Sequence, residues 1–221
     1  MAQPLLLINM VKWNSNFSYA IGLFTADGNI SPDGRHLEFC SKDLELVKNI
    51  KKCFNLDNKI CRKQRGTHPK KWYHRIQFGN KELYSFLIKI GLTPNKSKSL
   101  TYLDIPEEYF SDFLRGLIDG DGTIGYFMHP ESKEKQFRIR IASGSKGFLE
   151  WLGGEINKFL SIKGRIWQAL RTYELCYYKK ASKKMVDFIY YRSNVICLKR
   201  KFETARLMAM RTWRNWDTRT A

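Results

Sequence analysis

Apolar positions along the chain follow the same order of spacings twice. Alternation with period two is typical of strands, and apolar positions three to four apart are typical of helices. In the first half, alternating stretches end at residues 39 and 78, and helical spacing covers residues 44–54 and 83–90. In the second half, alternation covers residues 137–141 and 173–178, and helical spacing covers residues 148–159 and 185–189. Each half is therefore predicted to contain helix, hairpin, helix, hairpin and helix.

A similar segment opens each half: AIGLFTADG over residues 20–28 and LRGLIDGDG over residues 114–122. Both are predicted helices with small residues four positions apart. These small residues are Gly22 with Ala26, and Gly116 with Gly120. Such a flat stripe lets two helix backbones approach closely. The two opening helices are therefore predicted to pack on each other.

Each of these segments ends in an Asp-Gly pair, Asp27-Gly28 and Asp121-Gly122. We expect the two glycines to end their helices in the left-handed conformation. A carboxylate at a helix C-terminus is unfavourable, because that end already carries partial negative charge. If the stripes pack, Asp27 and Asp121 also lie side by side, which raises a carboxyl pKa or requires cations. An Asp before Gly can instead serve a turn, but two copies at one interface favour a divalent-metal site.

The two segments resemble the motif of the LAGLIDADG homing endonucleases, and the second copy matches closely. The first copy has Ala20, Phe24 and Thr25 where Leu, Ile and Asp are commoner. Two copies in one chain resemble the monomeric, pseudo-symmetric branch of the family. The resemblance implies an α+β fold of two tandem α-β-β-α-β-β-α units related by pseudo-twofold symmetry. The units would pack through the motif helices, and their antiparallel sheets would form a DNA-binding saddle.

A polar segment with Gly and Pro lies between the halves, over about residues 91–101. It divides the chain into predicted units 1–101 and 102–221, the second with an extra C-terminal helix after Arg192. The apolar run Pro4–Val11 is too short to span a membrane and lacks a preceding basic segment. We interpret it as an N-terminal arm laid on the core.

The chain is strongly basic, with 39 Lys and Arg against 21 Asp and Glu, a net charge of +18. Both halves share the excess, which favours one polyanion that spans both. The five cysteines are widely spaced and contain no Cys-x-x-Cys pair. This pattern indicates reduced thiols and argues against structural zinc. We therefore expect an intracellular protein, in a bacterial or archaeal cytoplasm or an organelle, with no membrane. The family resemblance implies a monomer with double-stranded DNA as its partner.

Basic residues and one glutamine on the predicted strands and turns are the candidate DNA contacts, although each basic residue taken singly could be a solvated charge. They are Arg35, Arg62, Lys63, Arg65, Lys70, Lys71, Arg75, Arg138, Arg140, Arg165, Gln168 and Arg171. The first hairpin is short in the first unit and long in the second, and the second hairpin shows the reverse. We therefore predict an asymmetric DNA target.

The resemblance also implies a chemistry. Asp27 and Asp121 would be catalytic metal ligands, assisted by the carbonyls of Ala26 and Gly120. The metal would be Mg²⁺, with Mn²⁺ as a substitute and Ca²⁺ binding without efficient cleavage. The family cuts both DNA strands and leaves 3′ overhangs.

A basic catalytic partner is also expected in each half. By alignment it falls at Lys81 and Lys183, which begin helices where positive charge is unfavourable. Lys42 matches a basic residue of relatives, whereas its counterpart Gly144 does not. The two active centres are therefore predicted to differ in rate.

Three further polar residues complete the comparison with the family pattern. Ser41 and Ser143 stand where the family often has Gln or Asn, and they would order a water or cap a helix. Asp119, whose counterpart is Thr25, is predicted to cap or orient.

Two other interpretations stay open. A LAGLIDADG-fold protein can be catalytically silent or bifunctional, as an intron RNA maturase or a DNA-binding regulator. A general DNA-packing protein would bind without sequence preference and without metal. Because both aspartates are present and no splice-junction residues are visible, we favour an intron-encoded endonuclease.

Overall fold

The computed structural model of the 221-residue protein describes residues 12–65, 68–128, 131 and 133–207. The predicted N-terminal arm over residues 4–11 lies outside the described residues. The side chains of Arg65 and Lys70 lie outside the description as well.

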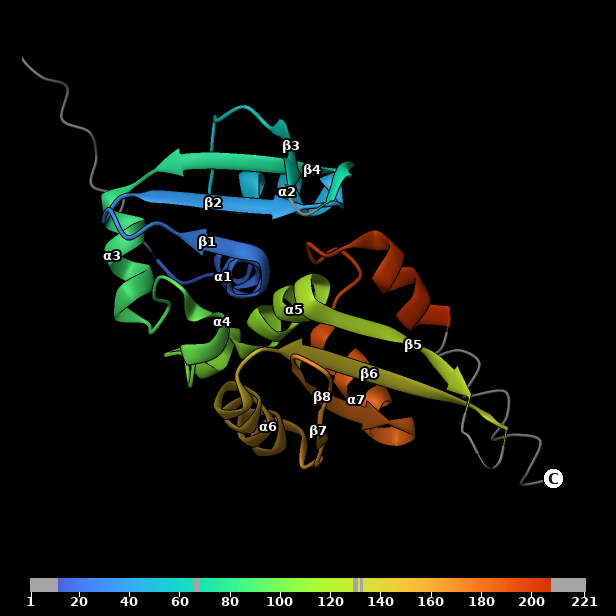
Figure 1. Ribbon diagram of the computed structural model, residues 1–221. Helices are drawn as coiled ribbons and strands as arrows, with labels where there is room; N and C mark the ends of the chain where they lie inside the picture. Colours follow the sequence, from blue (N-terminus) through green and yellow to red (C-terminus); the bar gives the residue numbers. More distant parts are fainter. Residues whose placement is uncertain (1–11, 66–67, 129–130, 132, 208–221) are drawn as a thin grey trace, which may run out of the picture.

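The described chain forms two halves of the same design, each with one four-stranded antiparallel sheet (Figure 1). The first half contains α1 (Ser15–Asp27), β1 (Gly28–Ile30), β2 (His36–Ser41), α2 (Leu44–Cys53), β3 (Cys61–Arg65), β4 (His68–Gly79), α3 (Lys81–Lys89) and the short α4 (Lys96–Ser99). Its strand order is β1-β2-β4-β3.

The second half follows a 3-10 turn, η1 (Glu107–Tyr109). It contains α5 (Phe110–Asp121), β5 (Gly122–Met128), β6 (Lys135–Ser143), α6 (Lys146–Leu160), β7 (Arg165–Gln168), β8 (Tyr173–Tyr178) and α7 (Lys179–Ile189), and residues 199–207 are also helical. Its strand order is β5-β6-β8-β7. The predicted α+β class and the repeated element order are confirmed.

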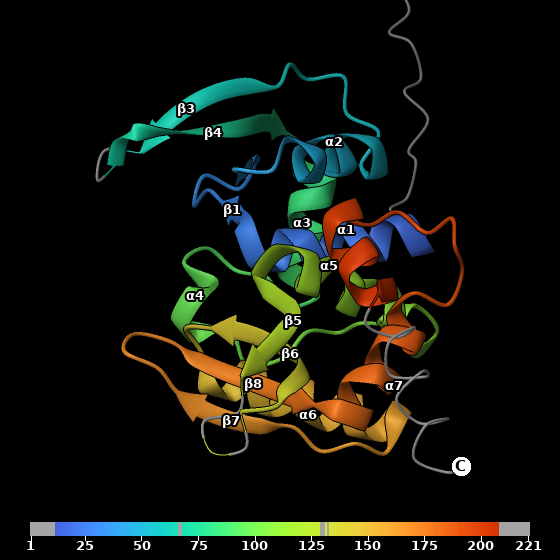
Figure 2. The same ribbon diagram turned by 90° about the vertical axis from the view of Figure 1, so that its right-hand side faces the viewer.

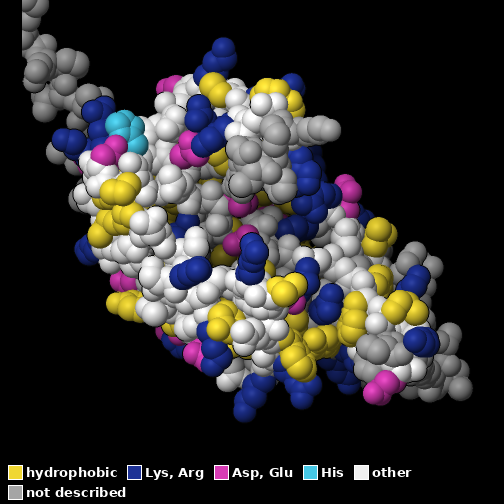
Figure 3. Space-filling model, viewed as in Figure 1, with side chains coloured by type: hydrophobic (Ala, Val, Ile, Leu, Met, Phe, Trp, Pro, Cys, Tyr) yellow, Lys and Arg dark blue, Asp and Glu magenta, His cyan; other side chains and the backbone are white. Residues whose placement is uncertain are grey.

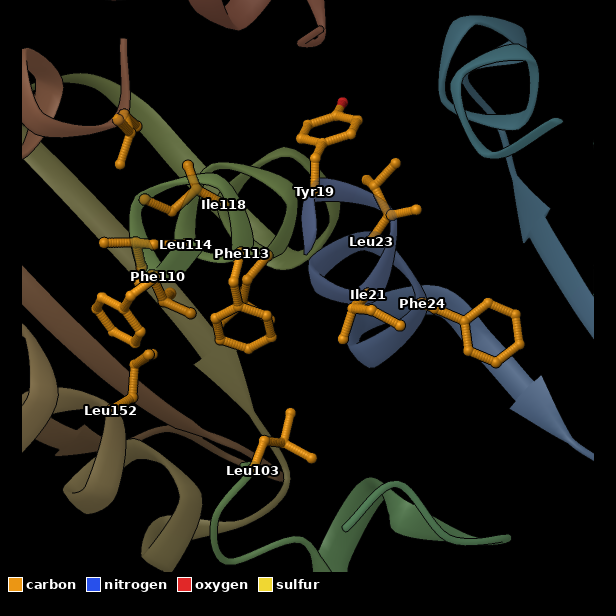
Figure 4. Close-up of a cluster of buried hydrophobic side chains, with 14 of the residues drawn as sticks. Tyr19, Ile21, Leu23, Phe24, Leu103, Phe110, Phe113, Leu114, Ile118 and Leu152 are labelled. Atoms are coloured by element: carbon orange, nitrogen blue, oxygen red, sulfur yellow. The ribbon is translucent and has the colours of Figure 1, made fainter. Parts of the chain in front are cut away.

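Helices α1 and α5 pack against each other at the centre of the molecule (Figure 4). A methyl group on Gly22 would lie 2.1 Å from the Phe113 carbonyl oxygen, and one on Gly116 would lie 2.0 Å from the Tyr19 carbonyl oxygen. One on Gly120 would lie 2.4 Å from the Cβ of Ala26. The backbones therefore touch where the small residues line up, as the sequence predicts.

The predicted left-handed helix ends are wrong. Gly28 has φ −77° and Gly122 has φ −90°, so both are extended. A methyl group on Gly28 would lie 2.4 Å from the Phe24 carbonyl oxygen, and one on Gly122 would lie 2.6 Å from the Ile118 carbonyl oxygen. Glycine is needed at both positions because the chain lies against the last turn of the helix as it enters the following strand, and a side chain would clash there.

Alternation on the strands separates a buried face from an open face. Leu37 and Phe39 of β2, and Ile139 and Ile141 of β6, are fully buried against the helices. The β3–β4 hairpin and the β7–β8 turn project on the same side of the molecule, with α4 between them (Figure 2). Within the described ranges, no helix has both the length and the apolar character needed to cross a membrane.

Candidate functional site

The two motif helices end beside each other with their aspartates close enough to interact. Burial and the neighbouring charge of Asp27 together raise the pKa of Asp121 to about 7, whereas Lys96 and Lys201 oppose the rise. Asp121 is nevertheless exposed to solvent, so the like charge of Asp27 is the stronger physical cause of the raised pKa. Two carboxylates held together in this way favour a bound cation.

Two hollows adjoin at this point and share Ala26, Lys96 and Ser97. The first hollow contains Asp27 together with Gly28, Asn29, Glu38, Cys40, Lys63 and Tyr73. The second hollow contains Asp121 together with Thr25, Leu100, Leu117, Ala142, Ser143, Gly144, Phe148 and Thr172. Figure 3 shows acidic side chains near the centre of this face, with lysine and arginine side chains around them.

Lys96 lies between the two hollows, at the first residue of α4. Its Nζ donates to the carbonyl oxygen of Gly28, and the side chain is 8% exposed. Burial lowers the pKa of Lys96 to about 8, an effect that Asp121 and Asp27 partly offset. The sequence places this lysine in a polar linker, where nothing in the local pattern distinguishes it from the neighbouring Lys98.

Lys201 is the counterpart of Lys96 in the second half. Its Nζ donates to the carbonyl oxygens of Ile118 at 2.7 Å, Asp119 at 2.8 Å and Gly122 at 2.7 Å. Burial lowers its pKa to about 8 as well, and Asp119 counteracts part of that effect. Gly28 and Gly122 directly follow the two motif aspartates, so a buried lysine contacts the end of each motif helix.

The structure does not bring Lys81 or Lys183 to the aspartates. Lys81 is exposed at the start of α3. The Lys183 Nζ lies 2.8 Å from Asp187 Oδ2 on its own helix. Neither lysine belongs to the described linings of the two hollows. The family pattern places the basic residue on the third helix of each half. In the structure, the chain comes back to the ends of the motif helices only after that third helix.

Ser41 and Ser143 both stabilise the turn that follows the second strand of each sheet. Ser41 Oγ accepts from the Asp43 N–H at 3.2 Å, and Ser143 Oγ accepts from the Ser145 N–H at 3.1 Å. Asp43 and Ser145 are the N-cap residues of α2 and α6. The predicted helix-capping role of Ser41 and Ser143 is therefore wrong, because each serine stabilises the turn before the N-cap residue and caps no helical N–H group.

Asp119 orients the C-terminal segment. Its Oδ2 accepts from Tyr19 OH at 2.9 Å and from the Leu198 N–H at 2.7 Å. Burial raises the pKa of Asp119 to about 6. Its counterpart Thr25 instead donates to the Ile21 carbonyl oxygen at 2.8 Å. Asp119 therefore joins both motif helices to the segment that carries Lys201.

Strand register separates the candidate DNA contacts into two groups. Residues on the open face are Lys63, Lys71, Arg75, Arg138, Arg140 and Arg165. Arg62 pairs with His74 and Gln168 pairs with Tyr173, so both lie on the opposite face. Arg35 and Arg171 lie in exposed turns. The open-face residues of the two sheets therefore flank the aspartate pair.

Two family models match the chain. The model described as a LAGLIDADG-like domain matches residues 16–91, and the one described as a WhiA LAGLIDADG-like domain matches residues 110–201. A comparison with curated proteins finds no match.

Similar solved structures include both WhiA proteins and homing endonucleases. Full-length DUF199/WhiA from Thermatoga maritima is 17% identical with a TM-score of 0.56; the match covers 92% of this chain but 63% of that protein. The homing endonuclease I-WcaI bound to its DNA recognition sequence is 15% identical with a TM-score of 0.60, and the match covers 88% of each chain. I-SmaMI bound to uncleaved DNA in the presence of calcium ions is 13% identical with a TM-score of 0.59, covering 92% and 93%.

At these identities the solved structures establish the fold alone. The two family models are both LAGLIDADG-like, stand in tandem and together cover well over half of the residues. Their matched ranges begin near the starts of α1 and α5, the helices that carry Asp27 and Asp121. The protein belongs to the LAGLIDADG family.

Proposed function

We propose that the protein is a monomeric, site-specific homing endonuclease that hydrolyses both strands of a long, asymmetric DNA duplex and leaves 3′ overhangs. The observation that carries this proposal is the pair Asp27 and Asp121, held side by side between two sheets with basic open faces. A merely structural role for the pair would leave unexplained why two like charges meet at a solvent-accessible hollow.

The open sheet faces support double-stranded DNA as the substrate. Strands that carry arginine on one face can lie in a major groove, where arginine pairs with guanine edges. I-WcaI and I-SmaMI, which share this fold, are bound to DNA. The long β3–β4 hairpin and the shorter β7–β8 hairpin make the two halves unequal, which fits an asymmetric target.

The donor set fits Mg²⁺. Asp27 and Asp121 supply carboxylate oxygens, and the carbonyls of Ala26 and Gly120 are further hard donors. Among the described residues there is no group of three or more His, Cys, Asp or Glu side chains that would enclose a metal. Mg²⁺ suits such a partial site because it keeps several waters and binds substrate phosphates. When bound, it supplies charge neutralisation and a water of lowered pKa. We expect Mn²⁺ to substitute, and Ca²⁺ to bind without efficient cleavage.

The chain itself contributes two buried cations to this chemistry. Lys96 lies between the hollows of Asp27 and Asp121 and interacts with both charges. A preorganised positive charge at this place stabilises the negative charge that develops on a phosphate during hydrolysis. Lys201 holds the end of α5 and so fixes the position of Asp121.

The test uses a randomised duplex library incubated with Mg²⁺, followed by sequencing of new ends. The parent protein should produce one enriched long site with staggered 3′ ends. Asp27→Asn and Asp121→Asn should bind the same site and fail to produce the ends. Asp57→Asn, at an exposed position between α2 and β3, is the matched control and should cut like the parent. Retained cutting by both motif variants contradicts the proposal.

A second candidate is a LAGLIDADG-fold binding protein that does not cleave, either a DNA-binding regulator or an intron RNA maturase. The match of residues 110–201 to the WhiA model favours this candidate, since the DUF199/WhiA structures are not described as endonucleases. Site-selective binding without new ends in the library experiment would support it. Splicing of an intron RNA that depends on the added protein would identify the maturase.

A further inference from the structure

The turn that follows the second strand differs between the halves. In the first half this turn carries Lys42, and in the second half the equivalent residue is Gly144. The equivalence is structural, because the serine before each residue accepts a hydrogen bond from the residue after it. The second half therefore lacks a basic side chain where the first half has one.

The glycine is required by the segment that covers it. A methyl group on Gly144 would lie 2.4 Å from the Ser97 carbonyl oxygen, which is far inside van der Waals contact. Ser145 Oγ donates to the Leu100 carbonyl oxygen at 2.5 Å, so α4 is fixed to the start of α6. Helix α4 thus occupies the space into which a side chain at position 144 would extend.

Helix α4 brings its own lysine to this place. The same methyl group on Gly144 would lie 3.7 Å from Lys98 Cγ, so the stem of Lys98 passes directly over the glycine. Lys98 is exposed, and it takes part in none of the ion pairs found among the described residues. Its neighbours Lys96 and Ser97 both line the hollow of Asp121.

Lys42 shows what such a cation does in the first half. Its Nζ lies 5.6 Å from the ring centroid of Tyr73, and Tyr73 lines the hollow of Asp27. In the second half the residue equivalent to Tyr73 is Thr172, which lines the hollow of Asp121. Threonine offers no ring that could support a cation, which is a second difference between the two hollows.

We propose that Lys98 replaces the missing basic residue at position 144 and contacts the DNA phosphate next to Asp121, the role that Lys42 would have next to Asp27. The linker between the halves then completes the second active centre. The expected effect of Lys98 on the cleavage rate rests on the proposed function. The expected phosphate contact concerns binding alone and does not require cleavage.

The catalytic test follows each strand separately in single-turnover cleavage of the preferred target. Lys98→Ala should slow cleavage of one strand at least tenfold and leave the other within twofold, whereas Lys42→Ala should slow the opposite strand. Lys98→Arg should restore most of the rate. Equal effects of Lys98→Ala on both strands, or no effect, would overturn the proposal.

The binding test is made in EDTA, so it is independent of cleavage. If Lys98 contacts a phosphate, Lys98→Ala should reduce the slope of log affinity against log salt by about 0.9. Lys48→Ala, an exposed lysine on α2, is the control and should leave the slope unchanged. Equal slopes for the two variants contradict the phosphate contact. A parent that binds selectively but never cuts would remove the proposed function while this slope still decides the role of Lys98.

Discussion

The open face of the first sheet places an acid on its second strand and a base on the neighbouring strand, whereas the second sheet has the charges exchanged. Glu38 of β2 pairs with Arg75 of β4 at 3.5 Å, and Arg140 of β6 pairs with Glu174 of β8 at 3.0 Å. Each pair occupies the same position relative to the serine that ends the second strand. Glu38 also pairs with Lys63 at 3.0 Å.

The difference shows which features the repeated fold requires. On the helix side, both sheets present buried apolar side chains in the same alternation, because that face must pack on the motif helices. On the open side, the polarity of a cross-strand pair can be reversed without disturbing the sheet. Under the proposed function, the two halves would read different DNA half-sites with one architecture.

The largest expected effect comes from disrupting the contact between α1 and α5, through which the two halves pack. Gly116→Ala places a methyl group 2.0 Å from the Tyr19 carbonyl oxygen, so α1 and α5 must separate. We expect a loss of about 3 kcal/mol or more in the free energy of unfolding, the upper range for overpacking. Urea denaturation measures it.

Gly154→Ala is the matched control, because this helical glycine has open space around its Cβ position. It should stabilise the protein by up to about 1 kcal/mol, since Ala has the higher helix propensity. Equal stabilities of the two variants would contradict the close packing of the motif helices.

The two buried lysines should differ in their effect on stability. Lys201→Met leaves three carbonyl oxygens at the end of α5 without their donor and should cost about 2 kcal/mol. Lys96→Met removes the donor to one carbonyl, at Gly28, and should cost less. Thermal unfolding of both variants at one pH measures the difference. A larger loss for Lys96→Met would contradict the structural role given to Lys201.

Divalent metal should stabilise the protein in a pH-dependent way. The pKa of Asp121 is raised to about 7, above its unfolded value, so its ionisation lowers stability progressively as the pH rises from about 4 to 7. A metal that binds the ionised pair competes with the proton. Ca²⁺ should therefore raise the melting temperature more at pH 8 than at pH 6.

Asp27→Asn tests the origin of this behaviour. Removing the Asp27 charge should lower the pKa of Asp121 and abolish most of the Ca²⁺ effect. The expected shift in melting temperature for the parent is a few degrees. An equal Ca²⁺ effect in the variant would place the metal elsewhere.

Exchanging the charges of the first-half pair should have the smallest effect on stability. Glu38→Arg combined with Arg75→Glu gives β2 and β4 the polarity found in the second sheet. The exchange also turns the Glu38–Lys63 pair into a like-charge contact, but these side chains are partly exposed, so stability should fall by about 1 kcal/mol or less. Base preference should change by about tenfold at one position of one half-site only. Target-library profiling measures it, and a change spread over both half-sites would contradict the assignment.

Local spacing was sufficient to predict the repeated elements and the motif-helix interface. Helical and strand periods are properties of short segments, and the small residues at Gly22 and Gly116 mark a contact between backbones. The predicted left-handed glycine ends were wrong because the close return of the chain over Phe24 and Ile118 depends on the following strand. A glycine needed for space and a glycine needed for positive φ look alike in a sequence.

The amino-acid sequence by itself determined the family, the α+β class, the two halves and the two aspartates, since each is written in a short segment. Only the tertiary structure decided which lysines accompany those aspartates. Lys96 and Lys201 follow the third helix of their halves, far along the chain from Asp27 and Asp121. Their positions depend on where the connecting segments cross the ends of α1 and α5, a long-range arrangement that no local periodicity specifies.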